Sequence, residues 1–511
     1  MKAPIKKQTK LDSENLTKKD ILYRKTIEYG ILGLIIFTPL PAAAVYEWSI
    51  LIVQLTVLLM MIAYFMMKNE PQNNRYLARS VRWPKYLFSG FFVLLILQVI
   101  PFPVAIVRII SPHSYSFRES FSVNLTSQKF MSISLIPSHT LKDGLELLSY
   151  FLIGFLIIRT VRKKQIKRIF YTLVFMGIFQ AFYGMFELTQ KNPRILFYKK
   201  IYNLDSITGT FVNRNHFSGY LEMVLPLAIG LVLARIDVFS MPGLSWRQKL
   251  LRLSEKGLAT ITLLLFGIIA MSLAIIFSKS RSGAFLLAYT FFLFFGLSAL
   301  YFRDVKKRDK RIMNILKVIF LAVIVLSLYG GIGSTLERFS LNEIMQEERP
   351  AIWATTIQIF TDFPLFGSGL GTFASIYPGL ESWGEPVNIF HAHNDYLEYL
   401  SELGIVGVSM LLGGIFLILV NSFLYWKERR HREVKGIALG GMVAIICILL
   451  HSITDFNLHI PANMMLFSIL LPLTLVIATY RYRESDAKKD VTVLKDQLSK
   501  IIAEKENAES V

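Results

Sequence analysis

The stretch over residues 391–407 carries the side chains that are best suited to chemistry. His393, Asn394, Asp395 and Glu398 stand there, directly before a long apolar run. Ionisable groups at the edge of a membrane segment usually mark function. A neutral imidazole can take a proton from a hydroxyl group as that hydroxyl attacks an electrophile. We therefore interpret His393 as a candidate general base.

Four polar residues follow His393 at or near helical spacing. They are Asn394, Asp395, Glu398 and Glu402, and we expect that some of them share a helix face with the imidazole and could orient its ring. The sequence leaves open which one does so. A lone histidine near a helix end is more often structural, but the surrounding polar pattern favours catalysis here.

Three arginines stand in connections between apolar runs where basic residues are otherwise scarce. They are Arg214 in Asn-Arg-Asn-His, Arg281 in Ser-Arg-Ser-Gly and Arg349 in Glu-Arg-Pro. A planar guanidinium suits bidentate binding of phosphate oxygens. The alternative for Arg281 is an arginine that snorkels to the lipid headgroups. Because Arg214 and His393 are predicted on the same side, we favour an anion site.

A second polar cluster fills the short connection before the last apolar run. It consists of Asp455, Asn457 and His459, which either cap helices or approach the same cavity from the other side. Asn215, beside Arg214, is a further supporting candidate. The sequence does not separate these alternatives.

Two other patterns were weighed as ligand sites. His391 and His393, with Asp395 nearby, invite a zinc interpretation, but no third ligand at suitable spacing is evident. We therefore predict no metal and no cofactor. A glycine cluster over residues 367–371 permits tight turns near a ligand or a helix start. It does not follow a strand and is no dinucleotide fingerprint.

Apolar residues dominate the chain. Of its 511 residues, 53% are hydrophobic and 18% are charged, and the mean hydropathy is +0.47. A soluble core cannot bury so much apolar surface, so lipid must be the solvent. The single cysteine, Cys447, excludes a disulfide framework and a cysteine-based metal site. We predict an all-α fold, a polytopic membrane helix bundle.

Long apolar runs separated by charged connections define the expected spans. A large external loop, residues 334–403, precedes the tenth of them. The twelve predicted membrane helices cover residues 26–45, 47–67, 86–107, 141–158, 169–188, 218–234, 258–277, 284–301, 314–333, 404–424, 437–452 and 462–480.

Every second connection is basic, which predicts the orientation, since cytoplasmic loops accumulate lysine and arginine. Both termini are therefore expected in the cytoplasm. The segments are a cytoplasmic N-terminal segment (1–25), a membrane domain (26–480) and a cytoplasmic amphipathic tail (481–511). The net charge of +20 then reflects topology and attraction to anionic membrane lipids. Neither a DNA-binding motif nor an aromatic-interleaved basic patch is present, so we expect no nucleic-acid partner.

The pattern His-Asn, nine residues, Gly-x-x-Gly, which begins at His393, resembles the signature of the O-antigen ligase family. The resemblance extends over about residues 26–480. It implies a multi-pass protein of the inner membrane that moves a glycan on the periplasmic face. The donor would be a polyprenyl diphosphate-linked glycan, and the acceptor a lipid A core glycolipid or another hydroxyl compound, without a metal ion.

Site roles carry over from the family residue by residue. His393 matches the motif histidine, the proposed general base, and Arg281 looks like the arginine that grips the diphosphate. Arg214 looks like a second phosphate-binding arginine. Asn215 and the run 455–459 also look similar to the family, without an assigned role.

Related functions remain as alternatives. Polymerases of the same superfamily often carry an arginine, ten residues and a glycine in two outside loops, a pattern that Arg214, Arg281, Arg338 and Arg349 all lack. A ligase is therefore favoured over an exopolysaccharide polymerase or a protein O-oligosaccharyltransferase. A transporter should need ionisable residues near mid-membrane, whereas the polar groups here cluster at the outer edge. We expect the imidazole and the guanidiniums to converge on one pocket that faces away from the cytosol.

Overall fold

The computed structural model of the protein is almost entirely helical. It describes residues 17–68, 75–121, 129–235, 256–301, 310–329, 333, 338, 340, 348–380, 389–429 and 431–480. Residues 1–16, the predicted tail and parts of the predicted external loop lie outside this description, so the predictions made for them stay predictions.

Each predicted membrane segment has a counterpart among the described helices. In chain order these are α2 (Lys18–Phe37), α3 (Glu47–Phe65), α5 (Arg82–Val99), α8 (Pro137–Thr160), α9 (Lys163–Leu188), α10 (Arg214–Arg235), α12 (Lys256–Phe277), α13 (Arg281–Tyr301), α14 (Lys310–Tyr329), α19 (Asp395–Glu428), α20 (Arg432–His451) and α21 (Pro461–Thr479). Within the described ranges, α3, α9, α10, α12, α19, α20 and α21 are long and apolar enough to cross a bilayer. The predicted all-α polytopic membrane fold is confirmed.

Prolines end two helices earlier than predicted. The first predicted helix was expected to reach residue 45, but α2 ends at Phe37, before Pro39 and Pro41. A short 3-10 turn, η2 (Ala42–Ala44), follows with positive φ at all three alanines. In the same way α5 ends at Val99, ahead of Pro101. Proline disfavours helical geometry in the residue before it and lacks a backbone donor.

Helix α19 begins at Asp395, whereas the sequence predicted its start at residue 404. The side chain of Asn394 accepts hydrogen bonds from the backbone amides of Tyr396 and Leu397, at 3.0 and 3.1 Å. This is a helix N-cap, which satisfies amides that have no partner inside the helix. The polar run therefore belongs to the helix.

Gly404 interrupts α19 with φ 61° and ψ −177°. Beyond the break, the backbone amide of Ile405 donates to the carbonyl of Pro364 over 2.9 Å. Before it, the carbonyl of Glu402 accepts from the amide of Gly369, also at 2.9 Å. The segment over residues 364–369 thus satisfies backbone groups that the break releases.

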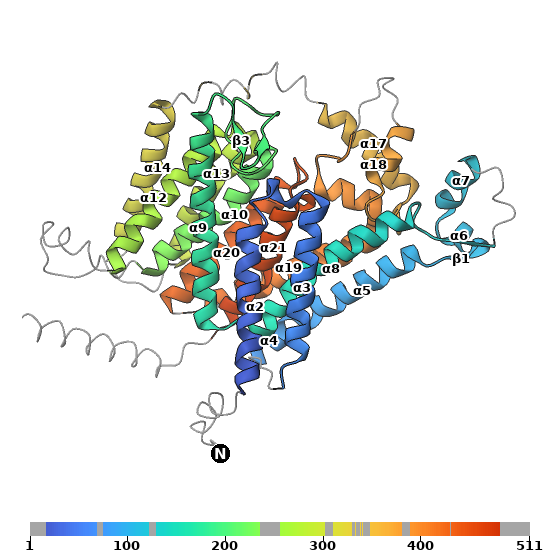
Figure 1. Cartoon of the computed structure of the whole chain (residues 1–511), viewed down its shortest axis with the longest axis horizontal. Coiled ribbons are helices and arrows are strands. Elements are labelled where there is room, and N and C mark those ends of the chain that lie inside the picture. The colour runs from blue at the N-terminus through green and yellow to red at the C-terminus, as the bar shows by residue number, and fades with distance from the viewer. Residues whose placement is uncertain are drawn as a thin grey trace, which may run out of the picture.

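The centre of the bundle is formed by α10, α20 and α21. A Cβ atom added to Gly440 would lie 2.6 Å from the carbonyl oxygen of Pro226, and one added to Gly436 would lie 2.7 Å from that of Gly230. Glycine at these positions lets the backbones of α10 and α20 touch, as small residues do between membrane helices. In Figure 1, α12, α13 and α14 flank this centre on one side and α5 and α8 on the other.

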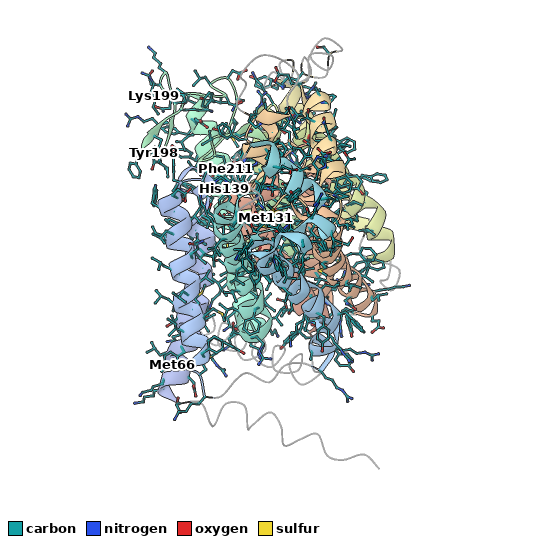
Figure 2. The ribbon with its side chains drawn as sticks, turned by 90° about the vertical axis from the view of Figure 1, so that its right-hand side faces the viewer. Met66, Met131, His139, Tyr198, Lys199 and Phe211 are labelled. Carbon is teal, nitrogen blue, oxygen red and sulfur yellow. The ribbon has the colours of Figure 1, made fainter. Side chains whose placement is uncertain are left out.

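Shorter elements gather at one end of the bundle. They include α17 (Arg349–Asp362), α18 (Phe373–Ile376), the 3-10 turns η7 (Tyr377–Gly379) and η8 (Asn457–His459), and the hairpin of β3 (Arg194–Ile195) with β4 (Tyr198–Lys199). Helix α17 and strand β3 lie at the end of the bundle opposite the N-terminus (Figure 1). Figure 2 shows Tyr198 and Lys199 at one end and Met66, which follows α3, at the other.

The remaining short elements stand before and after α5 in the chain. Helix α4 (Arg75–Ser80) precedes α5, and α6 (Val104–Ile110), α7 (Pro112–Phe121) and the pair of β1 (Phe102–Pro103) with β2 (Phe130–Met131) follow it.

Candidate active site

The buried carboxylate of Asp455 is the meeting point of the predicted site. His393 Nδ1 lies 3.3 Å from its Oδ1, and the Asn215 amide donates to its Oδ2 over 2.6 Å. His216 Nε2 lies 3.6 Å from Oδ1, and Arg349 Nη2 lies 3.8 Å from Oδ2. Asp455 follows α20, so four separate parts of the chain converge here.

These contacts keep Asp455 in its charged form. Burial alone would raise the pKa of this carboxyl group, but the close imidazoles of His216 and His393 and the positive charge of Arg349 hold the pKa well below its usual range. The backbone amide of Phe456 also donates to Oδ1, at 2.9 Å. Asp455 is therefore a fixed hydrogen-bond acceptor at neutral pH.

The ring of His393 is oriented by Asp455, so the expectation that a neighbour in the same helix orients it was wrong. His393 stands before the cap of α19 with φ 50°, a left-handed conformation that breaks the helical spacing. Its side chain is 30% exposed. With Nδ1 directed at Asp455, Nε2 is the nitrogen that remains for a substrate.

Thr454, the residue before Asp455, contacts both Arg349 and Ser282, the neighbour of Arg281. Arg349 begins α17 and donates through Nη1 to the carbonyl of Thr454. The hydroxyl of Ser282, next to Arg281, lies 2.8 Å from that of Thr454. The hairpin between α12 and α13, with Arg281 at its end, is thus held beside Asp455.

Arg214 belongs to the same group of cations. It is the first residue of α10, and the side chain of its neighbour Asn215 is hydrogen-bonded to Asp455. Three further guanidiniums, those of Arg281, Arg338 and Arg349, lie close enough to repel it electrostatically, and the carboxylate of Asp205 offsets this in part. Such a concentration of positive charge favours a multivalent anion.

The other predicted supporting residues form a second, adjacent cluster. His459 Nδ1 lies 2.6 Å from Oδ1 of Asp395, whose Oδ2 accepts from the amide of Leu458 at 3.0 Å. Glu398 Oε1 lies 2.8 Å from His391 Nδ1, and Glu398 Oε2 accepts from the amide of residue 392 at 2.7 Å. The run 455–459 therefore contributes Asp455 to one cluster and His459 to the other. Of the two sequence alternatives, this agrees with an approach to the site from the other side.

This second cluster borders a cavity of about 260 Å³. Four acidic side chains line it: Asp143, Glu146, Glu398 and Glu402. Burial would lower the pKa of His459, but the charge of Glu398 and the contact with Asp395 raise it to about 10. The cavity wall is acidic, in contrast to the arginine-rich surroundings of Asp455.

The ring of Phe456 touches both clusters. Its centroid lies 4.1 Å from that of His391, 4.9 Å from His393 and 4.5 Å from His216. His391 and His393 therefore contact one ring but serve different clusters. The prediction that no metal is bound stays a prediction. Among the described residues, the groups that come within reach of one ion are His391, Glu398 and His459, and neither His393 nor Asp395 belongs to this set.

The predicted glycine cluster makes the tight turns that were expected of it. Gly367, Gly369 and Gly371 have φ of 72°, 115° and 75°. A Cβ added to Gly367 would lie 2.1 Å from the backbone of Glu402, so only glycine fits there. The amide of Phe373 donates to the Glu402 carboxylate at 3.0 Å. The cluster packs against the first half of α19.

Sequence reasoning missed several residues of the site. His216 is one, although it directly follows Arg214 and Asn215 in a run that was singled out. Thr454 and Phe456 are others, and they flank Asp455. Asp143 and Glu146 in α8 carried no local signal, because acidic residues one turn apart are common on helix surfaces.

Comparison with known proteins gives one family. Residues 266–412 match the model of the O-Antigen ligase family. The matched range contains Arg281, Arg349 and His393, whereas Arg214 and Asp455 lie outside it. No curated protein matches the chain. The match covers less than half of the chain, and over this range it confirms the resemblance to the O-antigen ligase family that the motifs predicted.

Proposed function

We propose that this protein is a membrane glycosyltransferase of the O-antigen ligase type. It moves a glycan from a polyprenyl diphosphate carrier to an acceptor hydroxyl at the periplasmic face of the inner membrane. The observation that carries the proposal is the meeting of His393 and Arg349 on Asp455, beside the residues that hold Arg214 and Arg281 in place. A base beside phosphate-binding cations fits transfer from a diphosphate leaving group.

His393 acts as the general base. Its Nδ1 faces the ionised Asp455, so the Nδ1–H tautomer is favoured and Nε2 presents a lone pair. Nε2 takes the proton of the acceptor hydroxyl as the oxygen attacks the anomeric carbon. The nearby negative charge of Asp455 stabilises the imidazolium that forms, as an aspartate does in a catalytic triad.

The arginines stabilise the leaving group. As the bond from the anomeric carbon to the diphosphate oxygen breaks, the electron pair stays on the diphosphate. We assign Arg214, Arg281 and Arg349 to the binding of this growing charge, because the guanidiniums of Arg281 and Arg349 lie close enough to that of Arg214 to repel it. Fixed cations stabilise the transition state more than the ground state and so accelerate the chemical step. Attack opposite the leaving group inverts the anomeric centre, and no step of this scheme requires a metal ion.

A transporter is disfavoured by where the buried ionisable groups lie. His451 and Glu222 form a fully buried pair with 3.0 Å between Nδ1 and Oε2. His451 is the last residue of α20, and Glu222 lies in the first half of α10, so the pair sits toward the same end as Asp455. We therefore keep transfer chemistry on one side of the membrane as the proposal. The ligase is retained over the polymerase and the protein O-oligosaccharyltransferase because the polymerase arginine–glycine pattern is missing.

The test is transfer by the purified protein in lipid vesicles. A polyprenyl diphosphate-linked oligosaccharide is the donor, and lipid A core, the free oligosaccharide and a serine-containing peptide are the acceptors. Wild type is compared with His393→Ala and Arg281→Ala, and we expect each substitution to reduce transfer on the order of a hundredfold to a thousandfold.

Arg194→Gln is the matched control for the arginine substitution. Arg194 lies in β3 at the same end of the bundle, and its side chain is exposed. This variant should transfer at the wild-type rate. Normal transfer by a folded His393→Ala protein would overturn the role of the base, and transfer to none of the acceptors would overturn the proposed activity.

A further inference from the structure

The acidic cavity contains a set of side chains in metal-ligand geometry. His391, Glu398 and His459 each offer one ligand atom, and the three atoms lie within 4.8 Å of one another. The Glu398 Oε1 atom lies 2.8 Å from His391 Nδ1 and 3.4 Å from His459 Nε2. Ligands of tetrahedral zinc, at bond lengths near 2.0 Å, are about 3.3 Å apart. The first distance is that of a direct hydrogen bond and would lengthen around an ion, and the second is already close to this value.

The contact between His459 and Glu398 requires a cation. The Nδ1 atom of His459 is engaged with Asp395 at 2.6 Å. Its Nε2 atom is buried and makes no hydrogen bond in the described structure, although it lies 3.4 Å from the Glu398 carboxylate. Two lone pairs that face each other repel, so a proton or a metal ion must lie between them.

In the metal-free protein a proton fits between the two groups, because Glu398 and Asp395 raise the pKa of His459 to about 10, and a bound metal ion must displace that proton. The surroundings also suit a metal ion. Histidines that bind metal almost always donate their other ring N–H to a carboxylate or a carbonyl group, and Asp395 fills this role for His459. The Glu398 carboxylate is fixed in turn by the amide of residue 392 at 2.7 Å. The carboxyl groups of Asp143 and Glu146 also line the cavity, and negative charge there attracts a cation.

We infer that His391, Glu398 and His459 bind a single divalent cation of the zinc class. Two imidazoles and one carboxylate are a ligand set that zinc prefers, and the cavity leaves the fourth position for water or another oxygen ligand. The ion takes no part in the transfer scheme, since His393 and Asp455 do not line this cavity. It ties the loop before α19 to η8 and so stabilises the segment that carries His393.

The experiment measures zinc in the full-length protein, purified in detergent and freed of metal. Zinc is added, excess ion is removed by gel filtration, and bound metal is determined by mass spectrometry. We expect wild type to retain one ion per chain, and His391→Gln and Glu398→Gln to retain none. His113→Gln is the matched control, because His113 also faces a carboxylate, Asp362 at 3.5 Å, outside the cavity.

A second variant tests the supporting contact. Asp395→Asn keeps all three ligands but weakens the hydrogen bond that orients His459, so zinc affinity should fall about tenfold to a hundredfold. Cobalt added in place of zinc should give the visible absorption of a tetrahedral site in wild type and lose it in His391→Gln. This substitution is at a partly exposed side chain, so the test does not depend on a variant of the buried Glu398 folding.

Two results would overturn the inference. One is wild-type protein that retains no more zinc than His391→Gln, which would leave a proton as the only cation between His459 and Glu398. The other is equal loss of zinc from His113→Gln, which would mean binding at scattered sites. The zinc measurement does not depend on the proposed transfer activity. His393→Ala protein that is inactive in transfer but still holds zinc would show that zinc binding and transfer activity are separate properties.

Discussion

Replacing Asp455 with asparagine is the sharpest test of the site, because it removes one charge and keeps the shape of the side chain. Asn215 can still donate to the remaining oxygen, and the fold should be retained. What disappears is the negative charge 3.3 Å from His393 Nδ1 and 3.8 Å from the guanidinium of Arg349. The imidazolium that forms during transfer would then have no charged partner on this side.

The size of the effect follows from the geometry. Two unit charges about 4 Å apart interact by about 4 kcal/mol at the effective dielectric constant near a protein surface. Asp455 is fully buried, but the His393 side chain is 30% exposed, so solvent screens part of this interaction. Taking about 2 to 4 kcal/mol, and about 1.4 kcal/mol for each factor of ten, the rate should fall about thirtyfold to a thousandfold.

The assay is single-turnover transfer with the enzyme in excess over the lipid-linked donor, so that the chemical step is followed. The loss should appear in the rate constant, with donor binding changed less than in Arg281→Ala. Glu348→Gln, which removes an exposed negative charge next to Arg349, is a control for a general change of charge at this end of the bundle. If Asp455→Asn transfers within a few-fold of wild type while folded, Asp455 does not support the base.

Three further predictions concern stability. Gly404→Ala places a Cβ 2.4 Å from the backbone of Leu365, at a residue with φ 61°, and should lower the free energy of unfolding by at least about 1 to 3 kcal/mol. Gly33→Ala is the control, because Gly33 has open space around it and its substitution should not lower this free energy. Thermal unfolding in detergent compares the two variants. His451→Leu leaves the carboxylate of Glu222 buried without its imidazole partner, and should lower the free energy of unfolding by about 3 to 5 kcal/mol. Glu222→Gln should lower it less, and thermal unfolding in detergent measures both. The pKa of Asp455 lies below that of an unfolded aspartate, near 3.9, so its stabilisation is present above that pH and is lost as the pH falls through the folded value. The difference in melting temperature between wild type and Asp455→Asn should therefore be constant from about pH 5 to 8 and shrink below about pH 4. A difference that already shrinks between pH 5 and 8 would contradict the lowered pKa of Asp455.

Hydropathy predicted which segments are helices but misplaced one boundary that matters for function. The apolar run of α19 begins at Gly404, and the helix begins at Asp395. Hydropathy finds residues that face lipid. The first turns of α19 face protein instead, and they bury Glu398 and Glu402 against neighbouring segments. Their helical nature was visible in the capping residue Asn394, a local signal that the search for membrane spans does not use.

The convergence of the arginines was predictable because it depends on topology. Alternating basic connections assign the loops of Arg214, Arg281 and Arg349 to one side of the membrane. Membrane helices that pack in one bundle then bring these short connections together. The pairing of His393 with Asp455 was not predictable, since the two residues are 62 positions apart and no spacing rule links them. A helical spacing rule pointed to Asp395 and Glu398 instead.

The backbone conformation of His393 explains why helical spacing did not predict its partner. It also explains how the cationic cluster around Asp455 and the anionic cluster around Glu398 share one short loop. Residue 393 has positive φ and lies outside the helix, so its ring turns away from the face that carries Asp395 and Glu398. The base thereby reaches the cationic site around Asp455, while His391, two residues earlier, stays in the anionic cluster. The position of the base then depends on how firmly the anionic cluster holds the loop. Weakening the contact of Glu398 with His391 should therefore slow transfer without touching any residue that contacts substrate.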